Sequence, residues 1–132
     1  IENTLQMGEV VAVDTTAGTA RVRLGDLTTH QIPWMAQKAA GDHSWWPLQE
    51  GEWVMVGAPS GDMAQAVILG AVPTGKNPPH GGAGIWRLSF DDGSFIEFDN
   101  GEVNINATGD INFTAAGRFN VTAATIHLNE GG

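Results

Sequence analysis

Five acidic residues gather in one short stretch and are the first candidates for chemistry. They are Asp91, Asp92, Glu97, Asp99 and Glu102. Carboxylates at such spacing can act as a paired general acid and base, or they can bind calcium. The first two stand in an Asp-Gly turn pattern, where Asp is favoured for backbone reasons, and the others alternate along an expected strand. We therefore interpret them as turn and solvated-face residues and predict no catalytic residue.

The four histidines are the second candidates for chemistry. They are His30, His43, His80 and His127. None has the His-x-His or i, i+4 spacing of a metal site, and none lies in a recognisable nucleophile motif with a serine and an acid. The sequence also has no cysteine, which excludes disulfides and thiolate metal ligands. We therefore predict no metal site and no enzymatic activity.

Two adjacent tryptophans, Trp45 and Trp46, are the strongest single cue for binding. Adjacent indoles could stack on sugars or bases, or they could anchor a protein interface. The competing interpretation is that both rings fill the core. We favour one ring in the core and the other in a subunit contact, and the pair remains an interface or binding candidate.

Composition restricts the partners. The 132 residues carry 6 basic and 15 acidic side chains, a net charge of −9, which repels phosphate backbones and makes nucleic acid an unsuitable partner. No apolar run approaches the ~20 residues of a membrane helix, and the first residues do not resemble a signal peptide. With 18 glycines and no 3.6-residue apolar stripe, the chain is predicted to be all-β.

The elements that must position these residues fall into three segments. Residues 1–72 are predicted to form a small OB-like Greek-key barrel, residues 73–84 a Pro/Gly linker, and residues 85–132 a β-hairpin followed by repeats. Within the barrel, the expected strands are residues 8–14, 19–24, 31–36, 53–59 and 64–72, after a frayed lead-in at residues 1–6. The second hairpin is expected to turn at residues 60–62.

The C-terminal segment repeats every eight residues. The expected strands of its hairpin are residues 85–90 and 94–99, and the repeats follow directly. One apolar column contains Val103, Ile111 and Phe119, and a second contains Ile105, Phe113 and Val121. Strict alternation of apolar and polar residues predicts short strands with one buried face. Gly109 and Gly117 are expected to turn with positive φ or to lie where neighbouring walls of the repeat structure approach too closely for a Cβ.

Strands this short cannot bury their own apolar side chains. Three copies of the chain could cover them by forming an intertwined, trimeric, triple-stranded β-helix whose interior holds the two apolar columns. Closing the sheets in this way also removes exposed strand edges. The alternative is an ordinary antiparallel hairpin or meander attached to the barrel. The doubled Ala123-Ala124 shifts the register by one residue, so we expect His127 to point outward.

Several motifs, in this order, carry a family resemblance. They are Ile32-Pro33-Trp34-Met35, Ser44-Trp45-Trp46-Pro47 followed by Gly51-Glu52, Val67-Ile68-Leu69-Gly70, and residues 90–98 with the repeats behind them. The chain resembles the baseplate assembly protein V family, the central spikes of P2-like and Mu-like contractile phage tails and of R-type pyocins. The resemblance implies a homotrimer with an OB-fold domain docked into the tail and a β-helix pointing at the target cell.

Family members often end in a His-x-His motif that binds an apical iron ion. The sequence ends Asn129-Glu130-Gly131-Gly132, without that motif, so no cofactor is expected. The resemblance implies a structural spike of a phage or tailocin baseplate that is made in the host cytoplasm and punctures the cell envelope. Its implied partners are the tail hub, other baseplate proteins, a separate tip protein and, transiently, the bacterial outer membrane. The alternative is a carbohydrate-binding OB module that uses Trp45 and Trp46 and has an oligomerising β tail.

Overall fold

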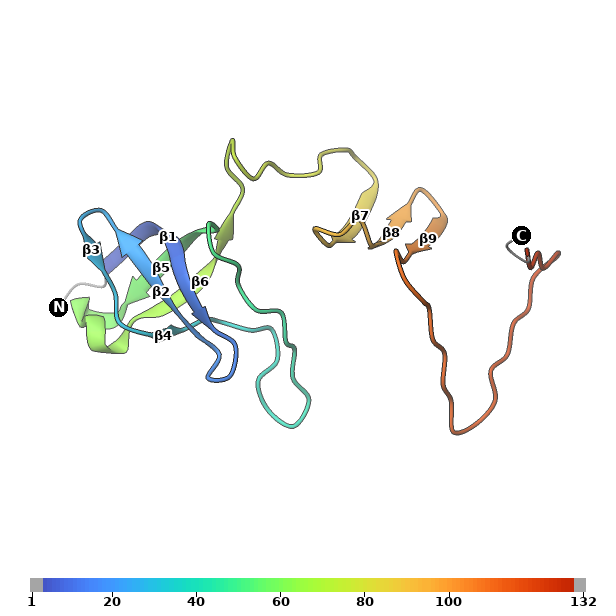
Figure 1. Ribbon diagram of the computed structural model, residues 1–132, viewed down its shortest axis with the longest axis horizontal. Helices are drawn as coiled ribbons and strands as arrows, with labels where there is room; N and C mark the ends of the chain where they lie inside the picture. The colour runs from blue at the N-terminus through green and yellow to red at the C-terminus, as the bar shows by residue number, and fades with distance from the viewer. Residues whose placement is uncertain (1–3, 130–132) are drawn as a thin grey trace. The chain divides into compact units, whose positions relative to one another are not determined.

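The computed structural model describes residues 4–129 and divides into two compact units, residues 1–80 and 81–132 (Figure 1). Both units are built from antiparallel β-strands. Between residues 4 and 129 there is no α-helix, and the only helical turns are two short 3-10 segments. The prediction of an all-β chain is therefore confirmed. The two units are described separately below.

The first unit is a six-stranded sheet that curls into a small barrel. Its strands are β1 (Thr4–Asp14), β2 (Thr19–Leu24), β3 (Leu27–Thr28), β4 (Ile32–Pro33), β5 (Trp53–Ala58) and β6 (Val67–Val72). The order is β3-β2-β1-β5-β6, and β4 also pairs with β2. A parallel bridge between Trp34 and Ile68, with the Met35 N–H donating to the Ile68 carbonyl at 2.9 Å, links the segment after β4 to β6.

The β1–β2 hairpin confirms the strands expected at residues 8–14 and 19–24. Its turn forms because the Asp14 carboxylate accepts hydrogen bonds from the N–H groups of Thr16 and Ala17, at 2.9 and 3.0 Å, while Gly18 supplies a φ of 72°. The strand begins earlier than expected, at Thr4. Residues 4–6 of the predicted lead-in therefore belong to β1, and residues 1–3 lie outside the described residues.

Two elements of the barrel differ from the sequence-based expectation. The strand expected at residues 31–36 shrinks to Ile32–Pro33, because proline has no N–H to continue a ladder. The second hairpin does not turn directly at residues 60–62. Two 3-10 turns, Pro59–Gly61 and Met63–Gln65, separate β5 from β6, and the Asp62 carboxylate accepts a 3.0 Å hydrogen bond from the Ala64 N–H.

The barrel core consists of the inward residues of the alternating strands. The buried apolar residues are Val10, Ala20, Val22, Leu24, Ile32, Val54, Val56, Ala58, Ala66 and Ile68. Thr29 is also buried, and its hydroxyl accepts a 3.0 Å hydrogen bond from the Val22 N–H. At Gly8, β1 lies so close to β2 that a side chain would not fit. A Cβ at this position would lie 2.4 Å from the Arg23 carbonyl oxygen.

The second unit begins with a three-stranded antiparallel sheet in the order β7-β8-β9. Its strands are β7 (Ile85–Ser89), β8 (Phe95–Asp99) and β9 (Glu102–Asn106). The β8–β9 turn is formed by Asn100 and Gly101, which have φ values of 48° and 97°. Two consecutive residues with positive φ are typical of the type I′ turn that matches strand twist. The hairpin expected at residues 85–90 and 94–99 forms as β7 and β8 and is confirmed.

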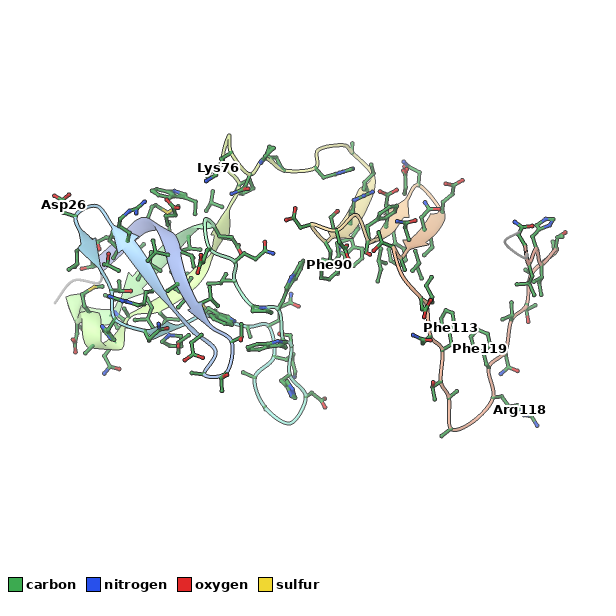
Figure 2. All side chains as sticks on the ribbon, viewed as in Figure 1. Asp26, Lys76, Phe90, Phe113, Arg118 and Phe119 are labelled. Carbon is green, nitrogen blue, oxygen red and sulfur yellow. The ribbon has the colours of Figure 1, made fainter. Side chains whose placement is uncertain are left out.

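In the single chain, residues 107–129 form no strand (Figure 1). The segment runs out in an extended form and turns back, so that the rings of Phe113 and Phe119 stack with centroids 5.3 Å apart (Figure 2). Gly109 and Gly117 have no positive φ, and a Cβ at either position would meet nothing within 4 Å. The positive φ expected at these two glycines is therefore wrong for the single chain, while the alternative, a close approach between walls of a trimer, stays a prediction.

Candidate functional site

The sheet of the second unit has one wholly apolar face. Register pairs Trp86 with Phe98 and Phe98 with Val103 in one row, and Leu88 with Ile96 and Ile96 with Ile105 in the next. Residues directly opposite each other in a ladder point to the same face. We call these six residues the apolar face: Trp86, Leu88, Ile96, Phe98, Val103 and Ile105. All except Leu88 are among the large apolar side chains that the single chain leaves exposed.

The opposite face of the same sheet is mixed, and its central side chains have partners within the chain. Arg87 and Glu97 form an ion pair across β7 and β8, with only 21% and 12% of their side chains exposed. The Arg87 guanidinium also lies 3.8 Å from the centroid of the Phe95 ring, and its Nε donates to the Ser89 hydroxyl at 2.7 Å. One face is therefore covered by its own side chains, while the apolar face is not.

The segment after β9 also has exposed apolar side chains. Four predicted trimer-core residues lie there and are at least half exposed: Ile111, Phe113, Phe119 and Val121. The other two, Val103 and Ile105, lie in β9 on the apolar face. The structure brings Val103 and Ile105 onto one face and stacks Phe113 on Phe119.

Asp92, Ser94 and Thr108 form a clip between the β7–β8 turn and the end of the first repeat, just after β9. The Asp92 carboxylate accepts a 2.8 Å hydrogen bond from the Ser94 N–H and a longer one, 3.4 Å, from the Thr108 hydroxyl. The Thr108 N–H donates to the Ser94 hydroxyl at 3.2 Å. The Ser94 backbone N–H, and then its hydroxyl, lower the pKa of Asp92 below its ordinary value of 3.8. The clip directs the chain out of β9 into the next repeat.

The clip assigns a role to one member of the acidic cluster, and two others also have local partners. Glu97 is paired with Arg87, and Asp99 accepts a 2.7 Å hydrogen bond from the Asn100 side chain. Within residues 4–129, no group of three His, Cys, Asp or Glu side chains could hold a metal ion. The sequence did not indicate the role of Thr108 in the clip. Its partners lie 14 and 16 positions away, and no local sequence pattern links such distant residues.

The two adjacent tryptophans have different neighbours. Trp45 packs against Trp34 with ring centroids 5.7 Å apart and lies next to the β1–β2 turn at Gly18. Trp46 lines a cavity with Leu48 and other residues of its own loop. The two rings are 57% and 56% exposed, so the expectation that one of them belongs to the core is wrong. Trp34 is the indole that packs against the core instead.

The first unit also has an apolar groove of about 450 Å³. It is lined by Thr4, Leu5, Met35, Gly57, Ala58, Pro59, Val67 and Leu69. Leu5 and Met35 are more than half exposed, and Leu69 is also exposed. In the single chain, β6 therefore leaves large apolar side chains, Leu69 and Val72, exposed. None of the helical segments in the described chain is long and apolar enough to cross a membrane.

The sequence of the chain matches a family model and a known protein. The family model described as the Type VI secretion system/phage-baseplate injector OB domain matches residues 6–72, about half of the chain and nearly all of the strands of the barrel. The chain is also 31% identical over 100 residues to the "Spike protein" of Escherichia phage P2. That match covers 75% of this chain and 47% of the relative, so the chain spans about half the length of the relative it matches. The chain belongs to the family of Type VI secretion system and phage-baseplate injector OB-domain proteins.

Proposed function

We propose that the protein is the homotrimeric central spike of a contractile phage tail or tailocin baseplate, with a structural and not an enzymatic role. Membership of the injector OB-domain family and the similarity to the phage P2 spike protein support this role. The proposed location is the tail baseplate of the assembled particle, after synthesis in the host cytoplasm. In this proposal, residues 1–72 form the OB domain, residues 73–84 a linker, and residues 85–132 the shaft.

The exposed apolar face is the observation that best supports a trimer. Six apolar side chains share one side of a three-stranded sheet, and the repeats add four more that the single chain leaves exposed. Full burial of one such side chain contributes about 1.5–3 kcal/mol. An exposed set of this size is typical of an interface. Three copies around one axis would bury all of it and pair the open edges of the strands.

Such a shaft would act mechanically. Its interior would be dry and interdigitated, with little compressibility, and its strands would be paired with those of the other copies. Local unfolding of one chain would expose apolar side chains of all three, so the shaft would unfold as one unit. A narrow, stiff shaft of this kind could transmit the force of sheath contraction to a small area of the outer membrane, with which its contact would be transient.

The barrel unit would attach the spike to the particle. The apolar groove at Leu5, Met35 and Leu69 is the surface of that unit best suited to a protein partner, because large apolar side chains border it. Membership of a baseplate family favours the tail hub or another baseplate protein as that partner. A separate tip protein is proposed at the other end of the shaft. The net charge of −9 argues against nucleic acid as a partner.

A dedicated carbohydrate-binding role for the Trp45–Trp46 pair is not favoured. The two rings have different neighbours, and Trp45 is stacked on Trp34, so the pair does not form one flat platform. The family match also concerns injector proteins.

Measurement of mass tests the proposed function directly. Light scattering on the purified chain over a hundredfold range of concentration should give three times 13.9 kDa throughout. A second experiment should mix the trimer with baseplates assembled without their spike. Restoration of infectivity or killing is expected for residues 1–132 and not for the barrel unit alone. A monomer at every concentration, or equal restoration by both, would overturn the proposal.

A further inference from the structure

Two adjoining cavities in the first unit form one cleft between two tryptophans. The larger, about 480 Å³, is lined by Trp46, Pro47, Leu48, Gln49, Glu50, Glu52, Ala71 and Asn77. The smaller, about 230 Å³, is lined by Glu52, Trp53, Ala71, Val72, Pro73 and Asn77. Glu52, Ala71 and Asn77 belong to both, so they lie in the middle of the cleft. Trp46 lines one end and Trp53 the other, and both indoles are exposed.

Backbone hydrogen bonds hold one wall of the cleft in place. Glu52 closes a turn on Gln49: its N–H donates to the Gln49 carbonyl at 3.2 Å, and its carboxylate accepts from the Gln49 N–H at 2.6 Å. Gly51 has a φ of 93°, which suits the third position of such a turn. The turn is fastened to β1 by two hydrogen bonds to Val10, of 2.8 and 2.9 Å. The carboxylate of Glu52 is therefore presented from a rigid support.

Asn77, which lines both cavities, belongs to a second turn, from Thr74 to Asn77, which also contains Lys76 (Figure 2). The Thr74 N–H donates to the Asn77 carbonyl at 3.0 Å, and the Asn77 N–H donates to the Thr74 hydroxyl at 3.1 Å. The side-chain amide of Asn77 reaches across to the Gly51 carbonyl at 3.5 Å. The two turns are thus joined to each other, and the polar groups in the middle of the cleft are positioned before any ligand arrives.

The chemistry of the cleft matches a sugar. A pyranose ring presents an apolar face of C–H groups, which stacks on an indole, and a rim of hydroxyls, which pair with carboxylates and amides. The cleft offers an indole at each end and a carboxylate and an amide between them. No basic side chain lines either cavity, and Glu50 and Glu52 would repel an anion. The volumes lie in the range of small-molecule sites.

We propose that this cleft, between Trp46 and Trp53, binds a neutral oligosaccharide, with one sugar ring on each indole and the hydroxyls between them on Glu52 and Asn77. The site belongs to the first unit of a single chain and does not depend on the proposed trimer. It goes beyond the spike role by giving the particle a weak affinity for uncharged glycans.

Titration of the purified chain, residues 1–132, with defined trisaccharides tests this proposal. The probes are cellotriose, maltotriose and tri-N-acetylglucosamine as neutral ligands, and trigalacturonate as the anionic one, followed by indole fluorescence and calorimetry. At least one neutral trisaccharide should bind saturably, and trigalacturonate should show no binding. Absence of saturable binding by all three neutral probes up to millimolar concentration would overturn the proposal, as would a preference for trigalacturonate.

Matched variants locate the binding. Trp46→Ala and Trp53→Ala should each weaken the affinity for the neutral probe about tenfold, since each removes one stacking surface. Asn77→Ala should weaken it to a smaller extent. Trp45→Ala is the control, because Trp45 lines neither cavity, and it should bind like the unmodified chain. An equal loss in Trp45→Ala, or no loss in both Trp46→Ala and Trp53→Ala, would show that the cleft is not the site.

A variant that removes the charge of Glu52 but keeps its shape tests what the negative charge contributes to ligand selection. Glu52→Gln keeps an acceptor for the Gln49 N–H and for sugar hydroxyls but removes one negative charge. It should keep affinity for the neutral probe within about threefold and allow weak binding of trigalacturonate. Loss of all binding, with the melting temperature unchanged, would contradict the proposed role of Glu52 as one hydroxyl partner among several.

Discussion

Trp86 and Phe98 meet edge to face across β7 and β8, with ring centroids 5.4 Å apart, and yet 52% of the first residue and 49% of the second stay exposed. Such a pair usually lies in a core or an interface. Its position on the apolar face, beside Val103 of β9, makes the sheet the first rung of the proposed shaft. The repeats that follow would continue the same interior, and the first prediction concerns them.

Phe113→Asp should prevent assembly of the trimer at neutral pH. If three chains meet at an axis, the change places three carboxylates close together in a dry interior, and each costs several kcal/mol even after relaxation. Sedimentation velocity should then show a monomer. Asn112→Asp is the matched control, since it adds the same charge one position away on the face expected to meet water, where salt screens repulsion. An intact Phe113→Asp trimer would mean that the repeats face another way.

Acid should loosen the Asp92 clip. Because hydrogen bonds from Ser94 depress the pKa of Asp92 in the folded chain, its contribution to stability is present above the ordinary pKa of 3.8 and is lost as pH falls through the depressed folded value. The protection of the Thr108 amide against hydrogen exchange, taken relative to the intrinsic rate at each pH, should therefore fall as the pH drops below the ordinary pKa of 3.8. Asp92→Asn should remove this pH dependence.

Thr108→Val tests the same clip from its other side. Valine keeps the shape of threonine but removes the hydroxyl that contacts Asp92 and Ser94. Exchange at the Thr108 amide should become faster than in the unmodified chain at neutral pH. Thr114→Val makes the same change at an exposed position of the next repeat and should leave that amide unaffected. Equal effects of the two changes would refute a specific clip.

Ile68→Ala should destabilise the barrel by about 2–5 kcal/mol, because Ile68 is only 1% exposed and its removal leaves a cavity in the core. Chemical denaturation followed by tryptophan fluorescence measures this loss. Leu27→Ala is the control in the same unit, where the side chain is mostly exposed, and it should change the free energy of unfolding by no more than about 0.5 kcal/mol. Comparable losses at the two sites would place the core elsewhere.

Gly8→Ala should destabilise the same unit by about 1–3 kcal/mol through overpacking. The added methyl would lie 2.4 Å from the Arg23 carbonyl oxygen, and a backbone atom cannot move aside as a flexible side chain can. Gly70→Ala is the matched control, since a Cβ there meets nothing within 4 Å. Thermal unfolding of both variants decides the point. A Gly8→Ala protein as stable as Gly70→Ala would show that β1 and β2 separate more easily than the structure indicates.

The sequence alone determined the elements whose signals are local. Alternation of apolar and polar residues predicted the strands around Val22 and Phe98, short apolar runs predicted the strand around Val54, and the Asp-Gly pattern predicted the β7–β8 turn. The ordered motifs predicted the family, which the match over residues 6–72 confirms. Each of these features depends on neighbours within a few positions, or on the linear order of short segments, and both can be read directly from the chain.

Only the tertiary structure decided features that join distant residues. It selected Trp34 over Trp45 and Trp46 as the indole against the core, tied Thr108 to a turn 14 and 16 positions earlier, and brought Asn77 within 3.5 Å of the Gly51 carbonyl. It also reduced the expected third strand to Ile32–Pro33. The physical reason is the same in each case: hydrogen bonds and packing between segments depend on how the strands cross, and no local propensity or periodicity encodes that crossing.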